Sequence, residues 1–147
     1  MHHKRSFRRK LQTFFLSLLL VLLTVAGVPS AAYTAEAASA DTTMAVHFLD
    51  VGQGLSILVQ SQGQNLLYDG GDRGHSSFVV SYLQKQNISI IDYMISSHYD
   101  EDHVAGLVGC LDSFSVKNVI GADYVQDTKI YQSFENSVAA QGLTVQH

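Results

Sequence analysis

Residues 97–103 (SHYDEDH) are the stretch of the sequence richest in groups that do chemistry, with two imidazoles and three carboxylates in seven positions. Neighbouring carboxylates repel one another, so crowding them costs free energy unless a positive charge lies among them. A divalent metal ion is the natural candidate, because neutral imidazole nitrogen and carboxylate oxygen suit zinc, manganese or iron. The candidate ligands are His98, Asp100, Asp102 and His103. Taken alone, these residues would fit a solvated acidic loop equally well.

The flanking residues predict that this segment links a buried strand to a helix. Residues 92–96 are a short apolar run typical of a strand, and residues 104–111 are apolar and helix-like. A loop after a strand can aim alternate side chains the same way, which would group His98, Asp100 and Asp102. The polar cluster is therefore expected at the carboxyl end of a strand, with His103 where the helix starts.

The part of the chain before this loop predicts an antiparallel meander and then a helix. Strand-like runs at residues 44–49, 56–60 and 65–68 are separated by turn residues. Asp50 with Gly52 and Gly54 indicates a tight hairpin, since glycine adopts positive φ easily. Phe78, Val79, Tyr82 and Leu83 recur at helical spacing, and Ser76 or Ser77 is the expected N-cap.

After the loop, the chain predicts a strand at residues 117–120, a helix at residues 128–141 and a further strand from residue 143. Asp127 is the expected N-cap of that helix and Gly142 its C-terminal stop. His47 lies inside a strand and is expected to be half-buried. Strands that alternate with helices predict an α/β (α+β) sheet with crossover helices.

The first 40 residues differ from the rest and resemble a secretory signal. Residues 1–10 contain five Lys or Arg, residues 14–28 carry no charge, and Pro29 is followed by small residues with Ala-x-Ala sites. We expect residues 1–40 to be a signal peptide, so that the protein is secreted and meets the membrane only transiently. An uncleaved anchor on the outer face of the cytoplasmic membrane is the alternative.

Residues 41–147 are expected to form one acidic domain. They contain four cations, Arg73, Lys85, Lys117 and Lys129, and twelve carboxylates, a formal charge of −8 with His neutral. Their 107 residues suffice for one small core. An acidic surface argues against tight binding of nucleic acid, which basic side chains usually supply, although a bound metal would return local positive charge.

Three motifs in order carry a resemblance to a known family. Residues 98–103 resemble the H-x-[HD]-x-D-H motif of the metallo-β-lactamase superfamily, in the form found in its competence-protein branch (ComEC/Rec2-like). Residues 48–54 (FLDVGQG) and 66–71 (LLYDGG) resemble two further motifs of that branch. The resemblance covers residues 44–147 and implies the first half of an αββα sandwich.

The resemblance also implies roles for single residues. His98 and Asp100 would bind one metal ion, Asp102 and His103 a second, and Asp69 would be the buried acid that orients the metal loop. Zinc is the expected metal, with manganese or iron as alternatives, and Asp102 the candidate catalytic residue. Paired metals that lower the pKa of a bridging water would hydrolyse an ester or phosphodiester. Family analogy suggests nucleic acid or a nucleotide as substrate.

Two departures from the family pattern leave other functions open. Leu55 stands where the branch usually has an acid after GQG, and the later acid and His ligands of the family are not found before His147. The domain of residues 41–147 is therefore expected to be truncated. The alternative to an exported hydrolase is a non-catalytic fragment, at best a weak metal-binding or interaction module.

The signal-peptide hypothesis predicts a mature N-terminus between Ala32 and Ala40, because the Ala-x-Ala sites lie there. N-terminal sequencing of the exported protein measures this directly. Recovery of residues 1–10 on membrane-bound protein would instead favour the anchor.

Overall fold

A computed structural model describes residues 43–147, whose six strands form one sheet in the order β1-β2-β3-β4-β5-β6. The strands are β1 Met44–Phe48, β2 Ile57–Ser61, β3 Gln64–Tyr68, β4 Ile90–Ile95, β5 Ser115–Ile120 and β6 Val145–Gln146. The helices are the 3-10 turn η1 Arg73–His75, α2 Ser76–Lys85, α3 Glu101–Ser113 and α4 Lys129–Ala140. The predicted signal segment, residues 1–40, lies outside the described residues.

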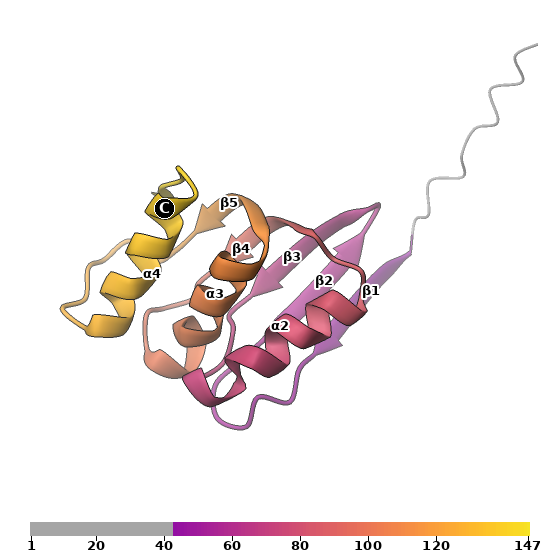
Figure 1. Ribbon diagram of the computed structural model, residues 1–147, viewed down its shortest axis with the longest axis horizontal. Coiled ribbons are helices and arrows are strands. Elements are labelled where there is room, and N and C mark those ends of the chain that lie inside the picture. The colour runs from indigo at the N-terminus through magenta and orange to yellow at the C-terminus, as the bar shows by residue number, and fades with distance from the viewer. Residues whose placement is uncertain (1–42) are drawn as a thin grey trace, which may run out of the picture. The chain divides into compact units, whose positions relative to one another are not determined.

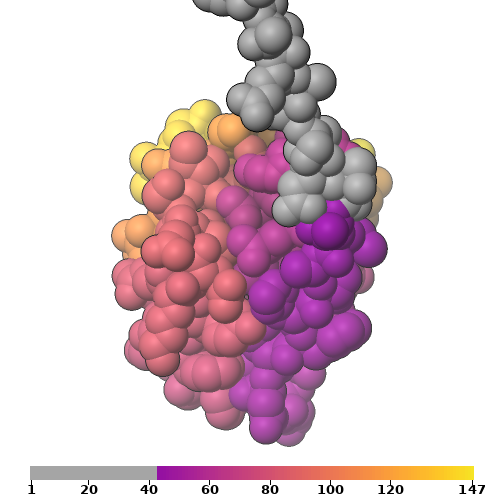
Figure 2. Space-filling model, turned by 90° about the vertical axis from the view of Figure 1, so that its right-hand side faces the viewer, coloured from indigo at the N-terminus to yellow at the C-terminus, as the bar shows by residue number. Residues whose placement is uncertain are grey.

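The sheet is mixed, as the sequence predicts. β1, β2 and β3 pair antiparallel as a meander, and β3 to β6 pair parallel. The parallel pairs need crossovers, which α2, α3 and α4 supply. Because these crossovers are right-handed and the strand order is sequential, all three helices lie on one face. Figure 1 shows them in front of the sheet, and Figure 2 shows α2 and the first strands as two layers side by side.

The core lies between the sheet and this helical layer. Every second side chain along the strands points into this core, and Leu58, Leu67 and Met94 are fully buried there. They pack with buried residues of the helices such as Leu83, Leu107 and Phe134. This packed core holds the sheet rigidly under the loops that follow its strands.

Within residues 43–147, no helix is both long and apolar enough to cross a bilayer.

Several helix boundaries differ from those expected. Thr128, not Asp127, is the N-cap of α4, because its backbone is extended and its side chain accepts from Tyr131 N. Ser76 is already helical, since η1 runs directly into α2 and His75 takes the N-cap position.

α3 starts at Glu101, three residues before the expected start, so Asp102 and His103 lie in its first turn. Gly142 follows α4 with a φ of 73°, as predicted.

The face of the sheet opposite the helices is apolar and partly exposed. Cross-strand registers align Val46, Val59, Leu66 and Tyr93 in one row and Phe48, Ile57, Tyr68, Ile95 and Ile120 in the next. Phe48 is 77% exposed and Tyr93 39% exposed. We call these two rows the open face. Contiguous apolar surface of this kind marks an interaction site or a tendency to associate.

The open face predicts that the isolated domain associates with itself and that Phe48→Ser weakens the association several-fold, because it removes the most exposed aromatic ring of that face. Sedimentation velocity over a concentration series measures the effect. Phe78→Ser is the matched control, since Phe78 is 43% exposed on α2, away from the open face. Equal association of both variants and the unaltered chain would contradict the prediction.

Candidate metal centre

A single buried carboxylate, Asp69, organises the loop that carries the candidate ligands. Asp69 follows β3 with a φ of 55° and is fully buried. Its Oδ1 accepts a hydrogen bond from Ser97 N at 2.8 Å, and its Oδ2 accepts from the Ser97 hydroxyl at 2.6 Å. His103 Nδ1 lies 2.8 Å from the same Oδ2. The carboxylate therefore ties the end of β3 to both ends of the loop.

Asp69 orients the two imidazoles, one directly and one through Ser97. His103 donates from Nδ1 to Asp69, so its Nε2 carries the free lone pair. The Ser97 hydroxyl gives its one hydrogen to Asp69 and therefore accepts from His98 Nδ1, at 2.8 Å. Both rings consequently present Nε2 as the atom able to bind a metal, which is the arrangement that metal-binding histidines generally need.

Each Nε2 faces one of the predicted carboxylate ligands. His98 Nε2 lies 3.5 Å from Asp100 Oδ2, and His103 Nε2 lies 3.8 Å from Asp102 Oδ2. The two imidazole rings are adjacent, with centroids 3.9 Å apart. Two ligands on one tetrahedral zinc, each about 2 Å from the ion, stand about 3.4 Å apart. Chemistry and spacing thus fit one divalent ion for each His–Asp pair.

These pairs are not complete sites by themselves. Across residues 43–147, no group of three or more His, Cys, Asp or Glu side chains is arranged to hold a metal ion. Structural and catalytic zinc sites generally use at least three protein ligands. The described part of the chain therefore supplies two oriented ligands for each ion, and the remaining ligands would have to come from elsewhere.

Close backbone contact holds the first turn of α3 against the end of β3. Gly70 N donates to His103 O at 2.8 Å, and Gly106 N donates to Gly71 O at 3.0 Å. A Cβ on Gly106 would overlap the carbonyl of Gly70, so only glycine permits this approach. The sequence alone does not predict that contact. Its only signal was a glycine inside an apolar helix, which usually has a packing reason.

The loop between β1 and β2 also reaches the site, which corrects the expected tight hairpin. β1 ends at Phe48 and β2 begins at Ile57, so Gly52 and Gly54 lie in a wide connection. Both have positive φ, as expected of glycine. A Cβ on Gly54 would overlap the carbonyl of Asp102. Gln53 donates from Nε2 to Asp102 Oδ2 at 3.4 Å, so this loop packs on a candidate ligand.

Tyr99 anchors the middle of the candidate loop, a role that the sequence analysis did not identify. The side chain is fully buried, its hydroxyl donates to Ala122 O at 2.8 Å, and its ring contacts those of Tyr124, Tyr131 and Phe134. Burial raises the pKa of Tyr99 to about 12. The signal available was one large aromatic residue among charged neighbours. Anchoring Tyr99 inward turns the flanking His98 and Asp100 outward.

Residues 72–74, for which the sequence predicts no role, form one wall of a cleft beside the loop. Asp72 accepts from His75 N at 2.9 Å and lies 2.7 Å from His75 Nδ1. The hydrogen bond from His75 lowers the pKa of Asp72. Arg73 Nε donates to Glu101 Oε1 at 3.3 Å across the cleft. The cleft has a volume of about 430 Å³ and includes Gln53 and Asp102.

Residues 49–128 match the protein-family model described as the metallo-beta-lactamase superfamily. Recombination protein 2 of Haemophilus influenzae is 39% identical over 77 residues, which cover 49% of this chain and 10% of that protein. Competence protein ComA of Neisseria gonorrhoeae is 36% identical over 63 residues, 42% of this chain and 9% of that protein. The resemblance predicted from the three motifs is confirmed, over about a tenth of each relative's length.

Solved structures also resemble the chain. Metallo-beta-lactamase SMB-1 bound to 2-mercaptoethanesulfonate is 22% identical with a TM-score of 0.45, over 51% of this chain and 29% of that one. Metallo-beta-lactamase FIM-1 from Pseudomonas aeruginosa in the mono-zinc form is 11% identical with a TM-score of 0.39, over 69% of this chain and 42% of that one.

The network around Asp69 predicts that Asp69→Asn lowers the free energy of unfolding by about 3 kcal/mol, because an amide cannot accept from every donor that now faces the carboxylate. Urea unfolding followed by circular dichroism measures the loss. Asp112→Asn is the control, because Asp112 is an exposed carboxylate that, among residues 43–147, accepts only from Ser137; this change should alter stability by less than about 0.5 kcal/mol. Equal, small effects at the two positions would show that Asp69 does not organise the loop.

Proposed function

The chain belongs to the metallo-beta-lactamase superfamily, and from that premise we propose that it is part of a metal-dependent hydrolase acting on ester or phosphodiester bonds. The bound ions would be divalent, zinc in the first place, with manganese or iron as alternatives. His98 and Asp100 would hold one ion, and Asp102 and His103 the other. When bound, such ions lower the pKa of a coordinated water and polarise the bond to be cleaved.

One observation carries this proposal: Asp69 and Ser97 turn both imidazoles so that Nε2 of each faces a carboxylate at 3.5 and 3.8 Å. A solvated acidic loop gives no reason for two histidines to be held by one buried carboxylate. Burying Asp69 costs free energy that three hydrogen bonds must offset. That cost is understandable if the orientation of the imidazoles has a function.

The residues of the chain have separate parts in the proposed site. Asp69 accepts from Nδ1 of His103 and so fixes the tautomer of that imidazole. The Ser97 hydroxyl, which donates to Asp69, accepts from Nδ1 of His98 and fixes its tautomer in the same way. Gln53 donates a hydrogen bond from Nε2 to Oδ2 of Asp102, the candidate catalytic residue, and so positions its carboxylate. Gln53 of the β1–β2 loop and residues 72–74 line the cleft in which a substrate would lie next to Asp102. These groups orient and bind, and the carboxylates and imidazoles supply the ligands.

The complete architecture is also a proposal. The chain spans about a tenth of the length of the relatives named above, and a two-ligand pair for each ion calls for further ligands. We propose that the open face is covered by a second sheet, which would give the αββα sandwich of the superfamily and bring those ligands. The apolar rows that include Phe48 and Tyr93 support this arrangement.

Export is the second part of the proposal. The cationic residues 1–10, the uncharged residues 14–28 and the following Ala-x-Ala sites support secretion, with anchoring to the outer face of the cytoplasmic membrane as the alternative. The names of the two relatives, a recombination protein and a competence protein, support nucleic acid or a nucleotide as substrate.

A second candidate function is a weak metal-binding or interaction module without turnover. The observation in its favour is that residues 43–147 group no three candidate donors around one ion. Two ligands leave an ion largely hydrated, so its water keeps a pKa too high for use at neutral pH. Metal-dependent hydrolysis of bis(4-nitrophenyl) phosphate by the 147-residue chain, well above an Asp102→Ala control, would exclude this candidate.

The metal proposal predicts that His98→Ala and Asp102→Ala each weaken zinc binding at their own pair about tenfold and so reduce total zinc occupancy by up to about half, because each removes one of the two ligands in that pair. Equilibrium dialysis followed by elemental analysis measures the occupancy. His47→Ala is the control, a half-buried histidine on β1 whose Nδ1 pairs with the Tyr82 hydroxyl at 2.9 Å. Equal retention of zinc by all three variants would mean that the loop is not the site.

A further inference from the structure

Two clefts flank the candidate metal loop, and one cation lines both. The first cleft, of about 430 Å³, includes Gln53 and Asp102. The second, of about 460 Å³, includes Asp100 and Lys129. Arg73 and Glu101 line both clefts, so the Arg73 side chain stands where they meet. It is therefore next to a carboxylate of each candidate metal pair.

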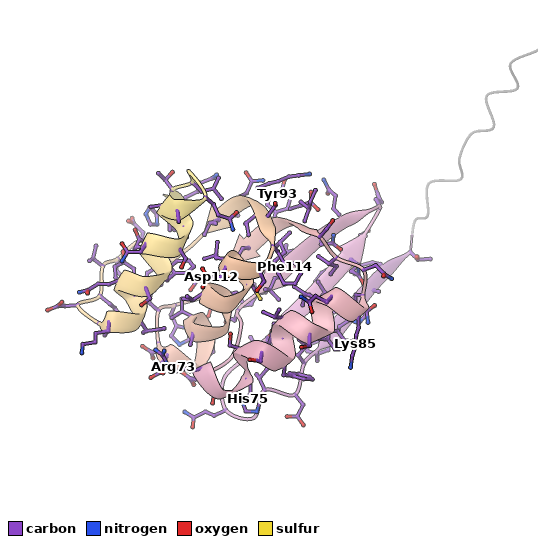
Figure 3. The ribbon with its side chains drawn as sticks, in the orientation of Figure 1. Arg73, His75, Lys85, Tyr93, Asp112 and Phe114 are labelled. Carbon is purple, nitrogen blue, oxygen red and sulfur yellow. The ribbon has the colours of Figure 1, made fainter. Side chains whose placement is uncertain are left out.

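Of the other three cations of the described domain, Lys129 lines the second cleft alone, and Lys85 and Lys117 line neither of the two. Lys117 pairs with Asp92 at 2.7 Å, and this ion pair lowers the pKa of Asp92. Lys85 ends α2 at the far end of the molecule, whereas Arg73 and His75 lie together at the end where α3 begins (Figure 3). In an acidic domain, a cation placed at the junction of two clefts is the group best suited to attract an anion into them.

Arg73 has binding capacity that its present partner does not use. Its ion pair with Glu101 engages Nε, at 3.3 Å, and leaves both terminal amino groups for a ligand. Their planar fork suits the two oxygens of a phosphoryl group or a carboxylate. Both partners of the pair are well exposed, at 72% and 58% of their side-chain surface, so the pair is weak and an anion can compete with Glu101.

The backbone under Arg73 is fixed, which favours binding over simple solvation. Asp72 accepts from both His75 N and His75 Nδ1 and so closes the turn that carries Arg73. A Cβ on Gly52 would lie 3.4 Å from the His75 ring, so the turn also packs on the loop that holds Gln53. The guanidinium therefore extends from a braced turn into the cleft.

We propose that Arg73 is an anion-binding residue, whose guanidinium holds a phosphoryl oxyanion of the substrate at the junction of the two clefts, beside Asp100 and Asp102. This inference rests on the proposed function for its substrate. The observations that carry it are the shared lining of the clefts, the unused amino groups of Arg73 and the braced turn. Gln53 contributes a second polar group to the same cleft.

The test is isothermal titration of the full chain, with and without zinc, using dimethyl phosphate as the probe and neutral trimethyl phosphate for comparison. Arg73→Gln should weaken dimethyl phosphate binding about tenfold, the loss of one charged hydrogen-bonding partner, and Arg73→Lys should restore part of it. Glu101→Gln should tighten binding several-fold, because it removes the competing carboxylate. Lys85→Gln should change nothing.

Zinc occupancy of each variant, measured by dialysis, separates this inference from the proposed function. Binding of the anion that depends on Arg73 supports the inference whether or not zinc is retained. If wild type binds dimethyl phosphate no better than trimethyl phosphate, or if Arg73→Gln binds it as tightly as wild type, the inference is overturned. If Arg73→Gln binds dimethyl phosphate as tightly as wild type but zinc is bound normally, the metal proposal still stands.

Discussion

The structure depends on the buried carboxylate of Asp69. A negative group without exposure to water is costly, and here three donors from the following loop and helix offset that cost. Since the donors belong to Ser97 and His103, the same bonds that stabilise the carboxylate also determine how the loop lies and which nitrogen of each imidazole faces outward. The stability of the β3 end and the orientation of the candidate ligands therefore depend on the same hydrogen bonds.

Close packing of backbone makes this arrangement possible. Asp69 can reach His103 because β3 continues into glycines that let α3 approach until backbone groups bond across the contact. Gly54 lets the β1–β2 loop approach Asp102 on the other side in the same way. The first turn of α3 is thus held between two loops, and Tyr99 anchors the residues before it under α4. The candidate ligands therefore lie in a rigid frame, although His98 and Asp100 belong to a loop.

The two faces of the sheet are unequal, and this has a consequence for function. The helices bury the centre of one face, including Leu58, Leu67 and Met94, while the open face keeps Phe48 and Tyr93 in contact with solvent. The candidate ligands follow β4 at its carboxyl end, at an edge that both faces share, so the second sheet proposed to cover the open face would also stand next to His98 and Asp102. Completion of the core and completion of the metal ligands are therefore expected to be coupled.

Local patterns in the sequence determined the order and type of the elements. Alternating apolar residues gave the strands around Leu58, Leu67 and Met94, helical spacing gave α2 and α4, and the crowded charges at residues 98–103 indicated a site after a strand. These properties depend on neighbours along the chain, which is why they could be predicted. Only the tertiary structure decided that Ser97 links Asp69 to His98, that Gln53 and Gly54 pack on Asp102, that Tyr99 is the anchor and that Arg73 joins two clefts. Those contacts connect residues that lie far apart in the sequence, up to 49 positions for Gln53 and Asp102, and no local periodicity encodes which distant groups meet.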